Sequence, residues 1–253
     1  MASSTKFEGA VKCVLLDIEG TTTPITFVHD VLFPYARNHL REYLDGHFDL
    51  ADAAIQGLFA RSSDLLGDSD EGLDEKESII KIVGKLMDRD EKFGPLKELQ
   101  GRIWQLGYDS GVLFGSVYPD VLPCIRKWRE NGLKVCIYSS GSVPAQKLLF
   151  GHIEPSQLHP NEQVLDYFNG FFDTAVGSKV ESPSYLNIAQ QLLLDPSDIL
   201  FLTDRVLEAQ AAREAKIKAV LLDRPGNAPL TDADRDPFMV ITSFEQLDLK
   251  VNA

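Results

Sequence analysis

The segment from Val11 to Phe27, VKCVLLDIEGTTTPITF, constrains the fold more than any other part of the chain. An apolar run ends at Asp17, and Glu19 follows two residues later, before Gly20 and three threonines. A short apolar run that is closed by turn-forming residues is typical of a strand buried on both faces of a parallel sheet. Asp17 is therefore expected at the carboxyl end of such a strand, where open α/β sheets bind their ligands.

The two carboxyl groups at this strand end admit two interpretations. Asp17 and Glu19, followed by glycine and hydroxyl side chains, can bind a divalent cation through their oxygen atoms. They can also be ordinary acidic turn residues. The spacing alone favours neither interpretation, so the choice depends on what the rest of the chain brings to the same edge of the sheet.

Beyond residue 115 the chain alternates between strand-like and helix-like segments. Short apolar strands are expected at 134–138, 199–203 and 218–222, with weaker candidates at 171–176 and 239–242. The helices expected between them cover 121–130, 143–150, 183–194 and 205–215, and Ser182 is expected as the N-cap of the third. This alternation predicts an α/β fold with a doubly wound, mostly parallel sheet and helices on both faces.

Residues 21–115 do not fit this alternation. They are charged and helical in pattern, with helices expected at 27–44, 52–66, 78–87 and 95–106, and Pro34 is expected to break or kink the first. A crossover between parallel strands needs only about a dozen residues. We therefore expect an α/β core of residues 1–20 and 116–253, with a helical cap domain of residues 21–115 inserted after the first strand.

Polar side chains follow three of the predicted strands. Asp17 and Glu19 follow the first, Ser139 and Ser140 follow the strand at 134–138, and Asp204 follows the strand at 199–203. Because the carboxyl ends of parallel strands share one edge of the sheet, these residues should converge. Asp17 and Asp204 could then share a Mg²⁺ ion, which prefers carboxylate oxygens and keeps water positions for a substrate phosphate.

The remaining groups suit a phosphate ester. Ser139, with the backbone amides of Ser140 and Gly141 at a helix start, can bind phosphate oxygens. Phosphoryl transfer also requires a fixed cation, and Lys179 lies in the loop before the helix at 183–194. The combination indicates a phosphoryl-transfer site more strongly than any single residue does.

Each of these residues also has a purely structural explanation. A serine before Gly141 is often a helix cap, a lone lysine in a loop is usually solvated, and Asp204 could cap the helix that follows it. Glu208, one turn further on, is either a surface residue or a contact behind the metal. The segment 224–227, RPGN, is interpreted as a turn in preference to an approach to the site.

The charge of the chain limits its partners. Twenty-five basic and thirty-eight acidic side chains give a formal charge of −13. Such a surface repels nucleic acids and anionic membranes, so neither is expected as a partner. An anionic substrate then requires a cation that locally reverses the sign, which favours a metal-dependent site. The acidic surface and the absence of heptads favour a monomer.

The cysteines and apolar segments indicate a compartment. Cys13, Cys124 and Cys136 form no CxxC motif, and two of them lie in apolar runs, as expected for buried thiols in a reducing environment. No signal region is recognisable, and no apolar run approaches the ~18 residues of a membrane span. The chain is therefore expected in the cytoplasm, and a nuclear presence is compatible with the same features.

Four segments together resemble the enolase-phosphatases of the methionine salvage pathway, a family within the haloacid dehalogenase-like hydrolases. They are DIEGTTTP at 17–24, YSSGS at 138–142, GSKVES at 177–182, and FLTD at 201–204 with Glu208 and Ala209. The resemblance extends from about residue 11 to 244, in the expected order. Glu19 stands where most of the superfamily has Asp, and it agrees with the enolase-phosphatases.

This resemblance implies a substrate and a reaction. The substrate would be 2,3-diketo-5-methylthiopentyl 1-phosphate, and the products an acireductone and phosphate, formed by enolisation and then hydrolysis of the enol phosphate. Asp17 would attack phosphorus and become a transient aspartyl phosphate. Glu19 would protonate the leaving oxygen, deprotonate the attacking water, and is also the candidate base for enolisation.

The resemblance also implies the ligands. Asp17, Glu19 and Asp204 would hold one Mg²⁺ ion, with Glu19 contributing its side chain or its backbone carbonyl. Ser139, Ser140 and Lys179 would bind the phosphoryl oxygens. The helical domain, with Phe27 and Val28 near its hinge, would close over the substrate and exclude water.

Two other functions remain open. The chain could be a phosphatase or phosphomutase of the same superfamily that acts on another small phosphate ester. It could also be a phospho-accepting signalling domain of the receiver type, although such domains lack an inserted lobe and carry their phosphorylated Asp on a middle strand. The positions of the acids favour catalysis.

Overall fold

The chain forms two compact units. The computed structural model describes residues 7–251, and it groups Met1–Val28 with Phe114–Ala253 in one unit and His29–Leu113 in the other. The first junction thus falls after Val28, eight residues later than the sequence boundary at residue 20. The reason is local, because the N–H groups of Thr21, Thr22 and Thr23 all donate to the carbonyl of Ile18 and tie this turn to the sheet.

The first unit is built on a six-stranded sheet in which every pairing is parallel. Its strand order is β4-β3-β2-β5-β6-β7. The strands are β2 (Cys13–Leu16), β3 (Lys134–Tyr138), β4 (Gly170–Phe172), β5 (Ile199–Thr203), β6 (Lys218–Leu222) and β7 (Met239–Ile241). The predicted doubly wound α/β fold is confirmed, and the expected strands at 134–138, 199–203 and 218–222 match β3, β5 and β6 residue for residue.

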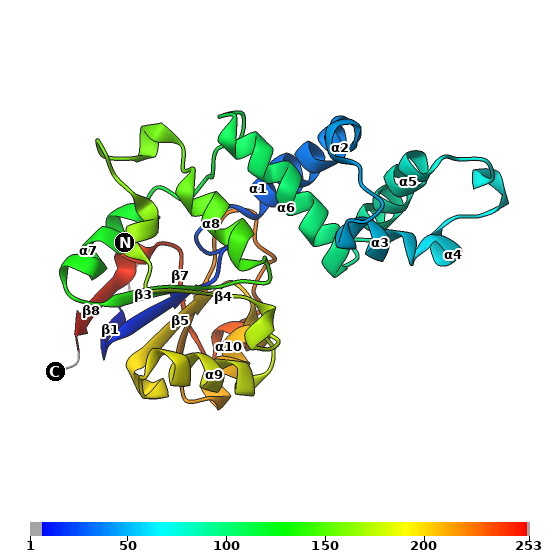
Figure 1. The fold of residues 1–253 in the computed structure, drawn as a ribbon. Coiled ribbons are helices and arrows are strands. Elements are labelled where there is room, and N and C mark those ends of the chain that lie inside the picture. The colour runs from blue at the N-terminus through cyan, green and yellow to red at the C-terminus, as the bar shows by residue number, and fades with distance from the viewer. Residues whose placement is uncertain (1–6, 252–253) are drawn as a thin grey trace. The chain divides into compact units, whose positions relative to one another are not determined.

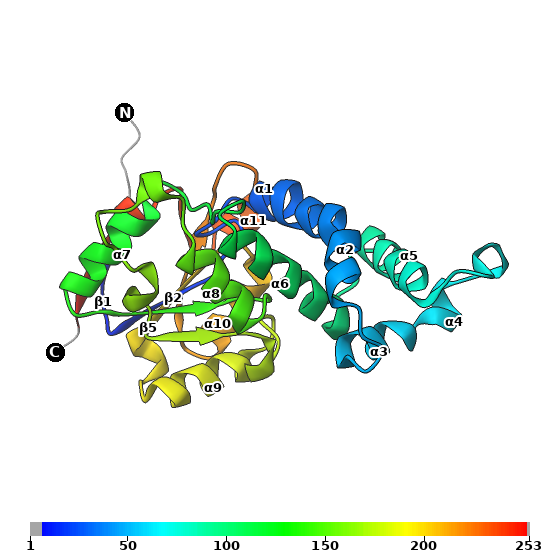
Figure 2. The same cartoon turned by 45° about the horizontal axis from the view of Figure 1, so that its top comes forward.

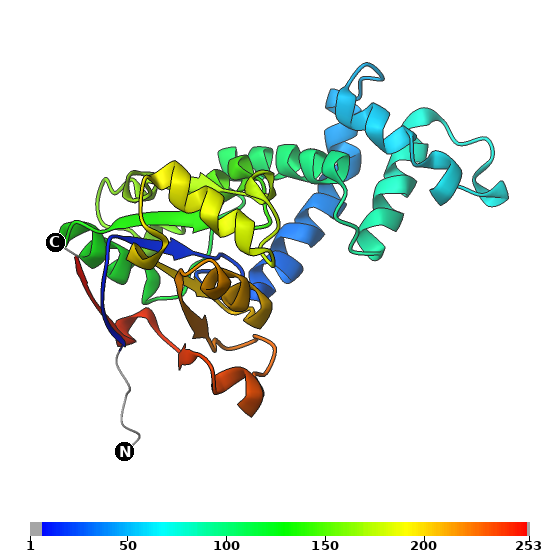
Figure 3. The same cartoon turned by 90° about the horizontal axis from the view of Figure 1, so that it is seen from below.

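Helices cover both faces of this sheet. On one face lie α7 (Val121–Glu130) and α8 (Val143–Gly151), and on the other α9 (Ser182–Leu192) and α10 (Val206–Glu214) (Figure 1). Viewed from below, α9 and α10 run side by side (Figure 3). Their small and aromatic residues pack on the buried strands in one core cluster that includes Tyr138, Tyr185 and Phe201. A short helix, α11 (Asp232–Arg235), precedes β7.

A second, two-stranded sheet was not predicted. Strand β1 (Phe7–Val11) pairs in parallel with β8 (Leu247–Val251), next to the chain ends (Figure 3). Lys12 separates β1 from β2, and its N–H donates to the carbonyl of Asp198. The apolar run that begins at Val11 is therefore shared between two sheets.

The second unit is helical. Its helices are α2 (Phe33–His47), α3 (Ala53–Phe59), α4 (Ser62–Leu65), α5 (Glu75–Asp88) and α6 (Gly94–Asp109), preceded by α1 (Ile25–Phe27) and a π-helical turn at Val28–Leu32 (Figure 2). Its own core contains Leu40, Ile79 and Ile103, among others. Pro34 lies in the first turn of α2, where a missing N–H is tolerated, so the irregularity falls in the π-helical turn before it.

Two expected helices differ from the structure. The segment 52–66 forms two helices instead of one, and Asp52 caps the first through the N–H groups of Ala54 and Ile55. Ser182 is the first residue of α9 and not its N-cap, which is Glu181 without a side-chain capping bond. Short 3₁₀ turns complete the chain at Asp68–Asp70, Pro155–Gln157, Val164–Tyr167, Thr174–Val176, Pro196–Asp198 and Phe244–Gln246. None of the helices within residues 7–251 is both long and apolar enough to cross a membrane.

A buried ion pair joins the end of β6 to the start of α7. The guanidinium of Arg224 donates to both carboxylate oxygens of Asp120, at 2.8 and 2.9 Å, and the two side chains are 3% and 11% exposed. The same guanidinium lies over the rings of Tyr118 and Phe244 and donates to the carbonyl of Thr21. Arg224 therefore connects the segment after β6 to the turn that follows Asp17.

We expect Arg224→Leu to destabilise the fold by about 3–5 kcal/mol, because it leaves the buried carboxylate of Asp120 without its partner. Burial by itself would raise the pKa of Asp120, but the hydrogen bonds and charge of Arg224 outweigh burial and lower it. The stabilisation from this ion pair is therefore present above about pH 4 and is lost as the pH falls below that value. Urea denaturation at pH 7 and pH 3 measures both effects. A penalty below 1 kcal/mol at pH 7, or one equal at both pH values, would contradict this account.

Candidate active site

Three neighbouring strands deliver the predicted site residues to one edge of the sheet. Asp17 follows β2, Ser139 follows β3 and Asp204 follows β5, and β2 lies between β3 and β5 in the sheet. All pairings are parallel, so the carboxyl ends of these strands lie together. The site therefore belongs entirely to the first unit.

The carboxylate of Asp17 is held by three donors. Its Oδ1 accepts a hydrogen bond from the N–H of Ile18 at 2.7 Å and lies 2.5 Å from the Nζ of Lys179. Among residues 7–251, its Oδ2 has only a long contact of 3.4 Å with the hydroxyl of Thr203, whose one proton is shared with Glu208. The side chain is 7% exposed. One oxygen is thus firmly anchored, whereas the other is the freer of the two.

Lys179 is a buried partner of two carboxylates and not a solvated loop lysine. Its Nζ lies 2.7 Å from Oε2 of Glu208 as well as beside Asp17, and its side chain is 8% exposed. The ammonium also lies 5.8 Å from the ring centroids of Tyr138 and Phe201. Burial by itself would lower the pKa of Lys179, but the two carboxylates outweigh it and raise the pKa, so the side chain stays charged.

The backbone that carries Lys179 is equally fixed. The hydroxyl of Tyr185 donates to the carbonyl of Lys179 at 2.6 Å, and the hydroxyl of Ser184 donates to that of Ser178 at 2.7 Å. Tyr138 donates to the carbonyl of Gly177. At Gly177, with φ of +130°, any side chain would collide with Ser184, which explains the glycine.

Glu208 is mostly buried beside Lys179, so it is not a surface residue, one of the two interpretations left open by the sequence, and a contact behind the metal stays a prediction. Besides Lys179, its Oε2 accepts a hydrogen bond from the hydroxyl of Thr203 at 2.8 Å. Burial and the negative charge of Asp17 raise the pKa of Glu208. Thr203, fully buried at the end of β5, connects the two acids, and sequence reasoning did not single it out.

Asp204 is also part of the acidic cluster. It does not cap α10, because the N-cap position is Arg205, whose side chain makes no capping bond. Burial, together with the charges of Asp17 and Glu208, raises the pKa of Asp204 to about 7. A carboxyl group with so high a pKa lies in a site with too little positive charge.

The charges of the cluster favour a divalent cation. Three carboxyl groups, those of Asp17, Asp204 and Glu208, lie near the buried ammonium of Lys179, and Arg205 adds a weaker positive influence on Asp204. Within residues 7–251 no three or more Asp, Glu, His or Cys side chains are already gathered as a complete metal-binding set. Two carboxylates with water and backbone oxygens are nevertheless a donor set typical of Mg²⁺, so the residues present fit this ion.

Glu19 lies in the tight turn that follows β2. The turn from Ile18 to Thr23 is closed by the N–H of Gly20, which donates to the carbonyl of Thr23, and by an isolated β-bridge between Glu19 and Thr23. Glu19 is partly exposed, unlike the buried Asp17. The turn therefore presents one buried and one more accessible acid.

The serines after β3 differ from the expected arrangement. Ser139 is buried, and its hydroxyl accepts a hydrogen bond from the N–H of Gly141 at 3.2 Å, so this amide is not directed at a ligand. The N-cap of α8 is Ser142, three residues later. Ser139 is thus not the helix cap, and Ser140 is exposed beside it.

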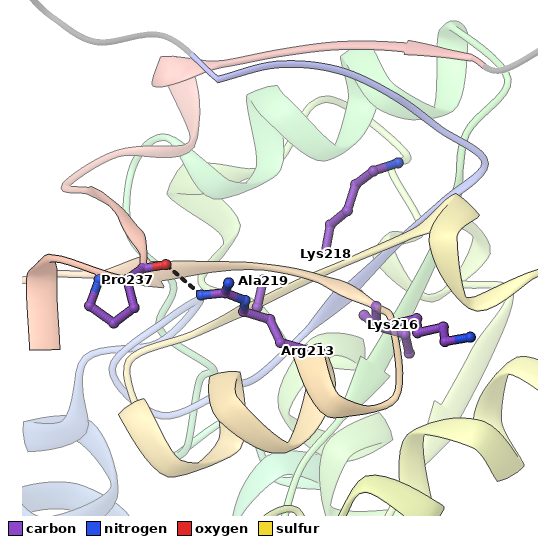
Figure 4. A pocket seen from close by; sticks show the side chains of 6 residues that line it. Arg213, Lys216, Lys218, Ala219 and Pro237 are labelled. Carbon is purple, nitrogen blue, oxygen red and sulfur yellow. Dashed lines mark hydrogen bonds between the residues drawn. The ribbon is translucent and has the colours of Figure 1, made fainter.

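A separate hollow of about 340 Å³ lies at the amino end of β6, away from the acidic edge (Figure 4). It is lined by Arg213, Lys216, Ile217, Lys218, Ala219 and Pro237. Two of its three basic groups have backbone partners, since Arg213 donates to the carbonyl of Pro237 and Lys218 to those of Ala10 and Ser197. This hollow is not the catalytic centre.

Comparisons with known proteins identify the family. The family model described as haloacid dehalogenase-like hydrolase matches residues 11–216. The enolase-phosphatase E1 of Danio rerio is 45% identical over 250 residues, covering 93% of this chain and 94% of the relative. That of Drosophila melanogaster is 46% identical over 252 residues, covering 96% of each. The chain belongs to the enolase-phosphatase E1 family of haloacid dehalogenase-like hydrolases.

Solved structures agree with this membership. The UTR4 protein of Saccharomyces cerevisiae has a TM-score of 0.74 and 36% identity, covering 93% of this chain and 99% of that one. CbbY from Rhodobacter sphaeroides, solved in complex with xylulose-(1,5)bisphosphate, has a TM-score of 0.59 at 14% identity, which shows a shared fold. The resemblance to enolase-phosphatases and the hydrolase class predicted from the sequence are confirmed.

We expect Asp204→Asn to change how stability depends on pH when a chelator removes all divalent cations. The pKa of Asp204 is raised from 3.8 to about 7 in the folded state, so this group favours folding below pH 4 and that contribution is lost as the pH rises through 7. Between pH 4 and pH 8, the free energy of unfolding of Asp204→Asn should therefore rise by roughly 1–4 kcal/mol relative to that of the unmodified protein.

The exposed Asp166→Asn is the matched control, and its stability should follow that of the unmodified protein at every pH. Thermal or urea denaturation in chelator provides the comparison. Parallel stability curves for Asp204→Asn and the unmodified protein would show that Asp204 is not held in an excess of negative charge.

Proposed function

We propose that the chain converts 2,3-diketo-5-methylthiopentyl 1-phosphate into an acireductone and phosphate, by enolisation followed by hydrolysis. The observation that carries this proposal is the buried pair of Asp17 and Lys179 at the carboxyl end of β2, in a chain of the enolase-phosphatase E1 family. The pair combines a fixed carboxylate with a fixed cation, which phosphoryl transfer needs. The substrate identity rests on the family.

Asp17, Asp204 and the turn at Glu19 would hold one Mg²⁺ ion. When bound, the ion supplies electrostatic stabilisation of the phosphoryl oxygens and polarises the adjacent carbonyl groups. The negative excess around Asp204 supports this assignment. Glu208 is better placed to hold Lys179 than to bind the ion directly, because its Oε2 already accepts from both Lys179 and Thr203.

In the phosphatase half of the reaction, Asp17 is the nucleophile. Its carboxylate oxygen forms a bond to phosphorus while the bond between phosphorus and the enol oxygen breaks, and the enol oxygen takes a proton. Water then attacks the same phosphorus, the acyl phosphate bond breaks, and phosphate leaves with Asp17 restored. Oδ2 of Asp17 is the suitable attacking atom, because Oδ1 is anchored by Ile18 and Lys179.

Glu19 is the proposed acid and base. As a carboxylic acid it gives its proton to the departing enol oxygen, and as a carboxylate it takes a proton from the attacking water. The same carboxylate is our candidate to remove the carbon-bound proton in the enolisation step. Its greater exposure compared with Asp17 supports a role that exchanges protons with substrate and water.

Ser139, Ser140 and Lys179 would bind the phosphoryl oxygens. Lys179 contributes a permanent charge, since two carboxylates raise its pKa. The hydroxyl of Ser139 accepts a hydrogen bond from the N–H of Gly141, and within residues 7–251 its own proton is available to a phosphoryl oxygen. Ser140, which is exposed, would contribute its backbone amide or its hydroxyl.

The helical unit would act as a cap that excludes water during the reaction. The π-helical turn at Val28–Leu32 begins at the junction between the two units and supports a hinge there, next to Phe27. We also propose that the enzyme is a cytoplasmic monomer without nucleic-acid or membrane partners. Its charge of −13 and its buried free cysteines support this.

We expect Asp17→Asn to reduce phosphate release by more than about a thousandfold while the fold remains, because an amide is a poor nucleophile. Phosphate release from the diketo substrate measures the effect, and Asp166→Asn, at an exposed position of the 3₁₀ turn Val164–Tyr167, is the control that should retain full activity. Turnover of the enol phosphate by Asp17→Asn would rule out this residue as the nucleophile.

The two half-reactions can be separated with Glu19→Gln. This variant should accumulate neither enol phosphate nor acireductone from the diketone, because the amide can accept no proton. Optical detection of the enol intermediate measures this directly. If enol phosphate accumulated at the unmodified rate, Glu19 would have no part in enolisation, while its role in hydrolysis would stand.

A further inference from the structure

The RPGN segment after β6 is more than a turn. Two of its side chains reach consecutive backbone carbonyls in the turn that carries Glu19. Nε of Arg224 donates to the carbonyl of Thr21 at 3.3 Å, and Nδ2 of Asn227 donates to that of Gly20 at 2.9 Å. The segment therefore holds the catalytic turn from a strand two positions away in the sheet.

The orientation of the Asn227 amide is determined by its contacts. Nδ2 donates to two carbonyls, those of Gly20 and Leu222, at 2.9 and 3.2 Å. With nitrogen and oxygen exchanged, an oxygen would face two carbonyl oxygens, which is unfavourable. Oδ1 must therefore point away from these carbonyls.

This oxygen, Oδ1 of Asn227, is buried and accepts no hydrogen bond from any residue within 7–251. It lies next to Gly20, whose backbone has a φ of +68°. A Cβ atom on Gly20 would lie 2.7 Å from Oδ1 of Asn227 and 2.7 Å from Oδ2 of Asp204. Both oxygens therefore lie close to the backbone of Gly20, and no side chain at this residue separates them.

A buried oxygen without a donor is unfavourable, and such a group usually lies next to a water or an ion. Its neighbour Asp204 offers no proton once it is ionised, as it would be when it holds a cation. Mg²⁺ keeps several of its waters when it is bound by one or two carboxylates, and these waters are strong donors. A water on an ion held by Asp204 would therefore supply the donor that Oδ1 of Asn227 lacks.

We infer that Asn227 is a positioning residue for the cation: its Oδ1 accepts a hydrogen bond from a water bound to the ion, while its Nδ2 fixes the carbonyl of Gly20. This inference rests on the proposed function, since it assumes a cation held by Asp17 and Asp204. It assigns to the RPGN segment a part in metal binding that neither its sequence nor its turn geometry requires.

Calorimetric titration of Mg²⁺ into the full chain, without substrate, tests this inference independently of activity. Asn227→Ala removes both the oxygen and the amide donors, whereas Asn227→Asp keeps an oxygen, removes the donors and adds a negative charge. We expect the alanine variant to bind Mg²⁺ about tenfold more weakly and the aspartate variant to bind at least as tightly as the unmodified protein. Asn187→Ala, which removes an exposed amide donating to the carbonyl of Val176, is the control and should not change binding.

Three results would overturn the inference. Unchanged affinity in Asn227→Ala would show that Oδ1 does not serve the ion. An equal loss in both variants would show that only the amide donors matter. Absence of Mg²⁺ binding by the unmodified protein would overturn the proposed cation site together with the role of Asn227. The first two results would overturn the role of Asn227 alone.

If Asn227→Ala does not fold, the unmodified protein still provides the test. The side-chain amide resonances of Asn227, assigned by their loss in Asn227→Asp, should shift as Mg²⁺ saturates the protein in nitrogen-15 NMR spectra, while those of Asn187 should stay in place. Resonances of Asn227 that do not move at saturation would overturn the inference.

Discussion

The ammonium of Lys179 lies between the carboxylates of Asp17 and Glu208, and the organisation of the whole sheet edge depends on this buried contact. Bringing three charged groups out of water is costly unless they are paired and hydrogen-bonded. The pairing is completed by Thr203, whose single hydroxyl proton has its shorter contact with Glu208 and its longer one with Asp17, and by two aromatic rings near the ammonium. Burial and the charges of Asp17 and Glu208 raise the pKa of Asp204, so this edge of the sheet carries an excess of negative charge. In the proposed function a divalent cation would supply the missing positive charge, and the excess would then contribute to its binding.

The fold supports this contact with rigid elements. The acids and Lys179 come from the ends of β2 and β5, from α10 and from the loop before α9, and the backbone of Lys179 is fixed by the hydroxyl of Tyr185. The turn after Asp17 is fixed from a further direction, where Arg224 and Asn227 bind its carbonyls and Asp120 holds Arg224. Close approach of backbone to carboxylate is possible only because residue 20 is glycine with a positive φ.

Much of the core could be predicted because its sequence signals are local. Continuous apolar runs that end in acid or serine mark β2, β3 and β5, and parallel pairing then brings Asp17, Ser139 and Asp204 to one edge. Glu208, Thr203 and Asn227 could not be assigned in the same way, because their roles come from contacts between segments far apart in the chain. Asn227 lies 207 residues from Gly20, and no periodicity relates the two. The β1–β8 pair was missed for the same reason, since it joins the two ends of the described chain. The Gly141 amide was assigned to a ligand from its place near a helix start, whereas in the structure it binds the adjacent Ser139 hydroxyl.

The central claim is that Asp17 attacks phosphorus before water does, and the stereochemical course at phosphorus tests it most directly. Each in-line displacement inverts the configuration at phosphorus, so two successive displacements restore it. A substrate whose phosphorus is made chiral with sulfur and oxygen isotopes, hydrolysed by the full enzyme with Mg²⁺, reports the outcome in the released thiophosphate. We predict net retention of configuration. Net inversion would mean that water attacks the substrate directly, and Asp17 would then have no role as a nucleophile.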